Sequence, residues 1–169
     1  MPRVRYQRFI LFCAVAVSCF ALAVACSDDD DDDDDDASPT ATSGEGGGGG
    51  ASLAVTLQEW AVNPETASAD AGTIEFTVEN TGPENEHEFV ILRTDLDPGA
   101  LPTNDDGSVD ESGEGIEVVD EVEELAVGDT ATLTVDLSAG NYVLICNLVD
   151  EETEEAHYEF GMRTAFAVN

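Results

Sequence analysis

Apolar residues alternate with polar residues along most of the chain beyond residue 50. Ile74, Phe76 and Val78 are separated by glutamate and threonine, and the segment 133–137 repeats this pattern with leucine and valine. Successive side chains of a β-strand point to opposite faces, so a period of two is typical of strands that bury one face. Shorter or less regular runs of the same character occupy residues 53–60, 87–92, 116–119, 141–146 and 164–168.

Turn signals rich in Gly, Pro, Asn and Asp separate these runs. Seven to eight short strands with such punctuation predict an all-β fold, an antiparallel β-sandwich. Only residues 119–125 have a helical pattern, and it is weak. The acidic stretch 93–114 is predicted to be an irregular insertion on the surface.

The composition is strongly acidic: 38 Asp and Glu residues accompany five Arg and no Lys, for a net charge of −33. Such a surface repels phosphates, so nucleic-acid binding and a polybasic membrane patch are excluded. An apolar fraction of 42% still permits a packed core. The acidity fits a high-salt environment and predicts a loss of stability at low salt.

The first 25 residues have the pattern of an export signal. Arg3, Arg5 and Arg8 precede an apolar run, 9–25, that contains no charge. The run ends in Leu-Ala-Val-Ala before Cys26, which resembles the lipobox of bacterial and archaeal lipoproteins. The resemblance implies cleavage before Cys26 and lipidation of its sulfur; Cys19 is a weaker competitor, and an uncleaved anchor is the alternative. Either way the rest of the chain is expected to be exported and tethered to a membrane.

Residues 26–50 are predicted to be a disordered linker. Nine consecutive aspartates, 28–36, repel one another, and Ser, Thr, Ala and Gly dominate the residues up to 50. The aspartates lack the turn of a calcium loop, so weak counter-ion binding is favoured over a calcium site. We therefore expect three parts: a signal peptide (1–25), a lipid-anchored linker (26–50) and one folded domain (51–169).

Few residues of that domain can bind soft metals. Once the signal is removed and Cys26 is lipidated, one cysteine remains, Cys146, with His87, His157 and Met162. An exported protein rarely keeps a lone free cysteine, so Cys146 is either a buried passive thiol or a ligand. Two imidazoles, one thiolate and a weak thioether are the donor set of a type 1 copper site.

The spacing of these residues resembles that of the cupredoxins, the family of plastocyanin and azurin. The resemblance is carried by Asn-Thr-Gly at 80–82 before Glu-His-Glu-Phe at 86–89, by the strand 142–146 that ends in Cys146, and by His157 with Gly-Met at 161–162. It covers nearly all of 51–169 and implies a Greek-key β-sandwich with one copper ion bound by His87, Cys146, His157 and Met162. It further implies an electron carrier rather than an enzyme, with the edge of His157 reaching the surface.

Two features depart from the family pattern. Ten residues, 147–156, separate Cys146 from His157, and they include five carboxylates and neither Pro nor Gly. Such a loop still delivers His157 if its middle bulges outward. Glu88 also follows the first histidine where plastocyanin-like members have Asn, so Asn80 or Asn147 is expected to brace the site.

The sequence favours a tethered blue copper protein on the outer face of the cell membrane or in the periplasm. We expect a monomer whose acidic loop attracts a basic, cytochrome c-like redox partner. Two alternatives stay open: a copper-free or weakly copper-binding module that binds a partner protein, and copper scavenging or delivery. The acidic ten-residue interval favours the first of these, and the single methionine of the domain disfavours the second.

Overall fold

The computed structural model describes residues 50–150 and 152–169. It contains nine strands and one short helix in these ranges: β1 (Ala51–Gln58), β2 (Ala61–Pro64), β3 (Ser68–Ala69), β4 (Gly72–Asn80), β5 (His87–Arg93), β6 (Glu117–Leu125), β7 (Thr130–Leu137), β8 (Gly140–Ile145), α1 (His157–Phe160) and β9 (Arg163–Val168). The predicted signal peptide, Cys26 and nearly all of the linker lie outside the described residues. Within those ranges, no helix is both long and apolar enough to cross a membrane.

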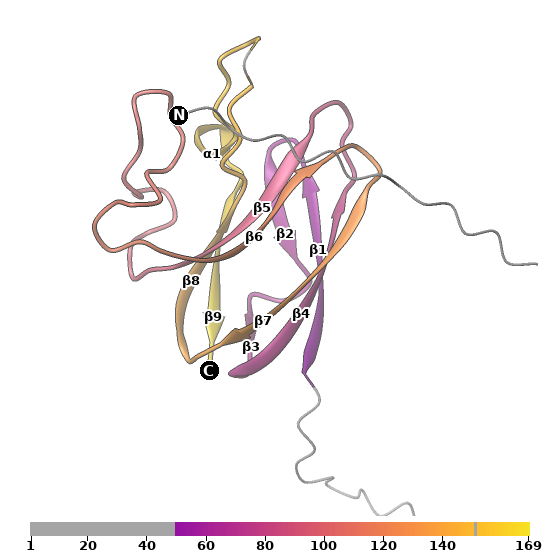
Figure 1. The fold of residues 1–169 in the computed structure, drawn as a ribbon, viewed down its shortest axis with the longest axis vertical. Helices are drawn as coiled ribbons and strands as arrows, with labels where there is room; N and C mark the ends of the chain where they lie inside the picture. The colour runs from indigo at the N-terminus through magenta and orange to yellow at the C-terminus, as the bar shows by residue number, and fades with distance from the viewer. Residues whose placement is uncertain (1–49, 151) are drawn as a thin grey trace, which may run out of the picture. The chain divides into compact units, whose positions relative to one another are not determined.

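The strands form two sheets (Figure 1). One has four strands in the order β2-β1-β4-β7, and the other has five in the order β3-β9-β8-β5-β6. The chain passes from the first sheet to β3, returns at β4, and changes sheet again before β5, β7 and β8. The predicted all-β sandwich is confirmed.

The core lies between the sheets and follows from the alternation in the sequence. Ile74 and Phe76 of β4 pair in register with Val135 and Leu133 of β7, so apolar side chains of neighbouring strands meet on one face. From the other sheet, Phe89 and Phe166 pack edge-on or tilted against Phe76, with ring centroids 5.6 and 5.9 Å away. These aromatic rings tie the two sheets together.

One sequence expectation is wrong, and one weak helical pattern has another origin. The sandwich is not purely antiparallel, because β1 pairs with β4 and β3 pairs with β9 in parallel. Residues 119–125 are not helical; they belong to β6. Val122 pairs with Phe89 and Leu125 pairs with His87, so β6 has one residue more than β5 between these two pairs. This β-bulge places apolar residues of β6 three positions apart, a spacing that is also typical of a helix.

The acidic segment between β5 and β6 is irregular, as predicted, but part of it is buried. Its Leu101 and Val109 join a second apolar cluster with Val90 and Val143, on the face of the five-stranded sheet opposite the core. Tyr158 of α1 fixes this segment: its hydroxyl donates to the Pro98 carbonyl and accepts from the Leu101 N–H. The segment is therefore a cover over one sheet and a support for the helix that begins at His157.

Candidate metal centre

His87 is the first residue of β5 and is fully buried. Asn80, at the end of β4, shapes the turn that leads to it. The Asn80 amide nitrogen donates to the carbonyls of Asn85 and Leu125, and its oxygen accepts from the Gly82 N–H. Gly82 has φ +65°, a conformation that favours glycine, and a Cβ there would collide with Val127. The Asn-Thr-Gly sequence thus sets the start of β5 and the place of His87.

Cys146 follows β8 directly and is also fully buried. Its backbone N–H donates to the Met162 carbonyl over 3.0 Å. Its sulfur accepts the N–H of Glu88, the residue after His87, over 3.3 Å. The thiol is therefore held by the strand that carries His87 and by the segment that carries Met162.

His157 begins α1 and reaches Cys146 although ten residues separate them. Val149 and Ala156 form an antiparallel bridge, and the Asp150 N–H donates to the Glu155 carbonyl. The two arms of the interval therefore lie side by side, and the His157 N–H bonds to the Leu148 carbonyl at their base. Figure 1 shows α1 at one end of the sandwich, beside this loop. The loop extends outward, as expected, and it brings His157 next to Cys146.

Three donor atoms converge in the space between these elements. The Nδ1 atoms of His87 and His157 are 3.2 Å apart, and the Cys146 sulfur lies 3.3 Å from His157 Nδ1 and 3.9 Å from His87 Nδ1. Metal–nitrogen bonds of about 2.0 Å and metal–sulfur bonds of about 2.3 Å, set at roughly 110–120°, place donor atoms about 3.3–3.8 Å apart. The spacing fits a single metal ion between the three residues.

Met162 is the fourth residue predicted for the site. It is fully buried, and its backbone connects the two ligand segments, since its N–H donates to the His157 carbonyl and its carbonyl accepts from the Cys146 N–H. The structure thus places Met162 beside both residues. A bond from its thioether sulfur to the metal is part of the proposed function.

Comparisons with known proteins bear on the fold. No protein-family model matches the chain, and no curated protein matches it. Among solved structures, a reduced auracyanin from the photosynthetic bacterium Roseiflexus castenholzii is 21% identical, with a TM-score of 0.51 over 72% of this chain and 99% of its own. The chain has the cupredoxin fold. Auracyanin A from Chloroflexus aurantiacus, described as a blue copper protein, is 18% identical, with a TM-score of 0.49 over 72% of this chain and 100% of its own.

The donor set of this domain is that of one type 1 copper site. Two imidazole nitrogens and one sulfur, all from buried residues, are the trigonal set that such copper prefers. Burial also affects the protonation of the two imidazoles. It lowers the pKa of His87 to about 4, with the neighbouring His157 adding to this, and it lowers the pKa of His157 as well.

The thiol responds to burial in the opposite direction. Burial raises the pKa of Cys146 to about 12, so the metal-free protein holds a thiol beside two neutral imidazoles at pH 7. Neutral imidazoles are ready to bind a metal, whereas the thiol must lose its proton when the metal enters.

Further residues of the domain hold these three in place. The Glu88 carboxylate accepts the Asn147 N–H over 2.9 Å, which links the residue after His87 to the residue after Cys146. The Asn147 side chain in turn bonds both the N–H and the carbonyl of Val109 in the covering segment. Both Asn80 and Asn147 therefore brace the site, as expected, and Glu88 takes part as well.

Two neighbours of the site were not predicted from the sequence: Glu59 and Trp60, in the turn between β1 and β2. The Glu59 carboxylate lies 3.8 Å from His87 Nε2. The Trp60 ring lies edge-on to the His157 ring, 5.1 Å away, and Phe160 packs on Trp60 at 4.8 Å. His157 is only 2% exposed, so its edge reaches the surface far less than expected, whereas Phe160 is 49% exposed. No local motif marks these positions, because their roles arise from contacts across the fold.

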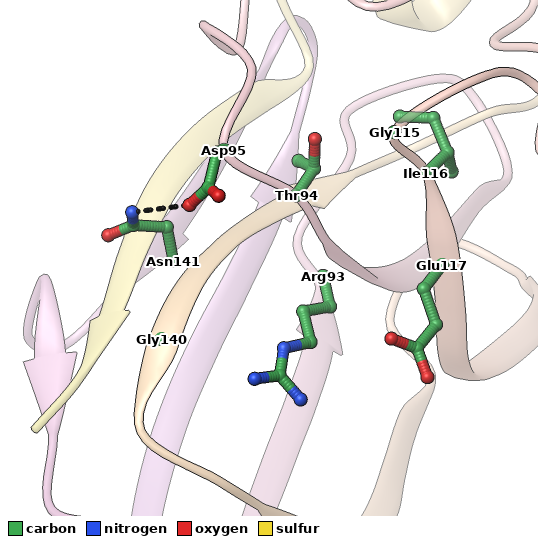
Figure 2. Close-up of a pocket in the computed structure, with 8 residues that line it drawn as sticks. All are labelled: Arg93, Thr94, Asp95, Gly115, Ile116, Glu117, Gly140 and Asn141. Carbon is green, nitrogen blue, oxygen red and sulfur yellow. Dashed lines mark hydrogen bonds between the residues drawn. The ribbon is translucent and has the colours of Figure 1, made fainter.

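A separate hollow lies at the other end of β5 (Figure 2). It is lined by Arg93, Thr94, Asp95, Gly115, Ile116, Glu117, Gly140 and Asn141. At one side of it, Asn141 donates to the Asp95 carboxylate over 2.8 Å. Arg93 and His87 are the two ends of one strand, about 20 Å apart. The hollow offers neither thiol nor imidazole and is distinct from the metal centre.

Proposed function

We propose that the protein is a membrane-tethered, extracytoplasmic type 1 copper protein that carries single electrons between redox partners. His87, Cys146 and His157 bind the copper, with Met162 as a weak axial ligand. The convergence of two imidazole nitrogens and one thiol sulfur within 4.8 Å of one another, all from buried residues, is the observation that carries this proposal. Bound copper supplies a one-electron couple between Cu(II) and Cu(I).

Electron transfer is favoured over catalysis because protein donors fill the coordination of the metal. A copper ion held by three buried donors and one axial thioether has no open position for a substrate. The four candidate ligands are each at most 2% exposed, which keeps solvent and substrates away from the ion. The protein's task is then to hold the copper and to exchange electrons through its surface.

The proposed exchange site is the aromatic pair Trp60 and Phe160, which covers His157. Phe160 is exposed and Trp60 is half-buried, so the pair links the buried ligand to the surface. Asp150, Glu155 and Glu159 lie in the same loop and helix as His157 and add negative charge. We propose a basic partner, such as a cytochrome c-like protein, met by the monomer in an encounter that weakens with salt.

The tether is proposed from the sequence alone. The signal peptide, lipidation at Cys26 and the acidic linker would place the copper domain outside the cell membrane or in the periplasm. An extracytoplasmic site also suits a free, buried cysteine that a metal protects from oxidation.

The first test is optical. One equivalent of Cu(II) added to the metal-free full chain is expected to give an intense blue or green band from charge transfer between thiolate and copper. Cys146→Ser removes the thiolate and is expected to abolish the band, while Met162→Leu, which removes only a weak donor, keeps it. A folded wild-type protein that binds Cu(II) without this band contradicts the proposal and favours a copper-free, partner-binding module.

A further inference from the structure

Two buried polar atoms, one on His87 and one on the neighbouring Glu59, lack hydrogen-bond partners within the described residues. His87 Nε2 and one carboxylate oxygen of Glu59, Oε2, have no hydrogen-bond partner among residues 50–150 and 152–169. The other oxygen, Oε1, lies 3.8 Å from His87 Nε2. The His87 side chain is 0% exposed and that of Glu59 is 12% exposed, so little water reaches either group. Buried polar groups are rarely left without partners, and these two have complementary chemistry.

The metal centre decides where the His87 proton lies. His87 Nδ1 points to the Cys146 sulfur and to the other imidazole, so a copper ion there takes the lone pair of Nδ1. A neutral imidazole then carries its proton on Nε2. An Nε2–H group needs an acceptor, and a carboxylate on the far side of a metal-bound histidine is a common one.

Glu59 is held where its carboxylate can accept a hydrogen bond from that N–H group. Its Oε1 accepts the backbone N–H groups of Glu84 and Asn85, over 3.0 and 2.5 Å. Backbone N–H groups are hydrogen-bond donors, so they favour the charged form of the carboxylate that accepts them. The carboxylate is therefore fixed to the turn that leads into β5, with two donors that stabilise its negative charge.

We propose that Glu59 is a positioning and potential-setting residue of the copper centre: it accepts the Nε2–H of His87, leaves Nδ1 free for the metal, and lowers the reduction potential through its negative charge. This inference rests on the proposed function, because it concerns the same copper ion. Cu(II) with one thiolate carries one positive charge more than Cu(I), so a fixed anion behind His87 stabilises the oxidised form. Reduction adds one electron from the partner and leaves Glu59 and its hydrogen bonds unchanged.

The test compares the midpoint potentials of copper-loaded variants of the full chain. Glu59→Gln keeps an oxygen for the N–H groups of Glu84 and Asn85 but removes the charge, so the potential is expected to shift upward while the blue band persists. Glu59→Asp keeps the charge and is expected to stay closer to the wild-type potential. Glu84→Gln is the matched control: it removes the same charge from an exposed neighbour, and its smaller shift is expected to vanish at high salt.

The outcomes separate this inference from the proposed function. A wild-type protein without the blue band removes the copper centre and this inference together. A blue Glu59→Gln protein whose potential matches that of Glu84→Gln overturns the role of Glu59 alone.

A second measurement needs no copper. Nitrogen chemical shifts of the metal-free protein report the tautomer of His87, which is expected to be Nε2–H in the wild type. If the Nδ1–H tautomer of His87 is as abundant in the wild type as in Glu59→Gln, Glu59 does not position His87. This result stands even if a variant fails to bind copper.

Discussion

Glu88 is a carboxylic acid in a place that disfavours charge. It follows His87, it is half-buried, and its carboxylate accepts the Asn147 N–H. Burial raises its pKa to about 7, and the nearby Glu121 and Glu111 add to the effect. At neutral pH this residue therefore lies close to half ionised in the metal-free protein.

We predict that Glu88→Gln stabilises the metal-free protein more at pH 8 than at pH 5. The folded-state pKa lies above the ordinary 4.5, so the wild type gains stability from protonated Glu88 at low pH and loses it as the pH rises through 7. Gln does not titrate, so the difference in unfolding free energy should grow by on the order of 1–3 kcal/mol across this range. Urea unfolding at several pH values measures it, and the titrations of His87 and His157 cancel in the difference.

The control is Glu86→Gln, at an exposed position two residues earlier. Its effect on stability is expected to be small, because the side chain is exposed. A Glu88→Gln difference that does not change between pH 5 and pH 8 would contradict the raised pKa of Glu88.

Some residues of the site could be predicted from the sequence and others could not. The meeting of His87, Cys146 and His157 was predictable because soft-metal donors are scarce in this domain and lie near the ends of recognisable strands. Met162 stays a prediction as a ligand. Glu59 was not, since a glutamate in an acidic chain carries no signal until the turn that holds it is seen to pass behind His87. The exposed fraction of His157 likewise depends on Trp60, nearly a hundred residues earlier.

The loop between β8 and α1 is the element in which this domain departs most from the expected pattern. Its arms are joined by the Val149–Ala156 bridge and by the bond from Asp150 to Glu155, and His157 is fixed at the base by the Leu148 carbonyl. The length beyond this bridge does not enter the geometry of the three donors. The long loop therefore preserves the positions of the three donor atoms.

Replacing residues 151–154 with Asn-Gly should leave the copper band intact. Two residues close a hairpin of this width in a type I′ turn, so the bridge and His157 keep their places. Visible spectra with one equivalent of Cu(II) test this. The comparison is a variant that lacks residues 149–156 and therefore the bridge itself, and it is expected to lose the band. If the Asn-Gly variant also loses the band, the acidic tip has a direct role in the copper site.

The strands were predictable to different degrees. Long strands such as β4 and β7 pair apolar with apolar residues at every second position, so their period is visible in the sequence. β3 has two residues and is too short for any period. The β6 bulge shifts the alternation, and the parallel pairing of β1 with β4 depends on a path through the other sheet, which local sequence does not encode.

At the scale of the whole molecule, charge opposes folding. Residues 51–169 include 28 acidic residues and two arginines, a net charge of −26, and most of the acids are exposed. Like charges at this density repel one another in the compact state more than in the unfolded chain. Counter-ions should therefore stabilise the fold.

We predict that the melting temperature rises with NaCl, with most of the increase below about 0.5 M. The screening length falls from roughly 30 Å at 0.01 M to about 10 Å at 0.1 M and 3 Å at 1 M, so repulsion between exposed carboxylates is largely removed over this range. Circular dichroism melts of the protein measure the effect. Sucrose, which is uncharged, separates screening from solute exclusion: an equal rise at matched osmolality would contradict the electrostatic explanation.

The burial of the donor atoms has a kinetic consequence. His87, Cys146 and Met162 are 0% exposed and His157 is 2% exposed, and backbone hydrogen bonds join the segments that carry Cys146, His157 and Met162. When the copper charge changes by one unit, few water molecules lie close enough to reorient, and the rigid frame gives the ligands little room to shift. The reorganisation energy of the electron step should accordingly be small. Turnover would then be limited by how often a partner finds the aromatic surface over His157, and not by the electron's own passage.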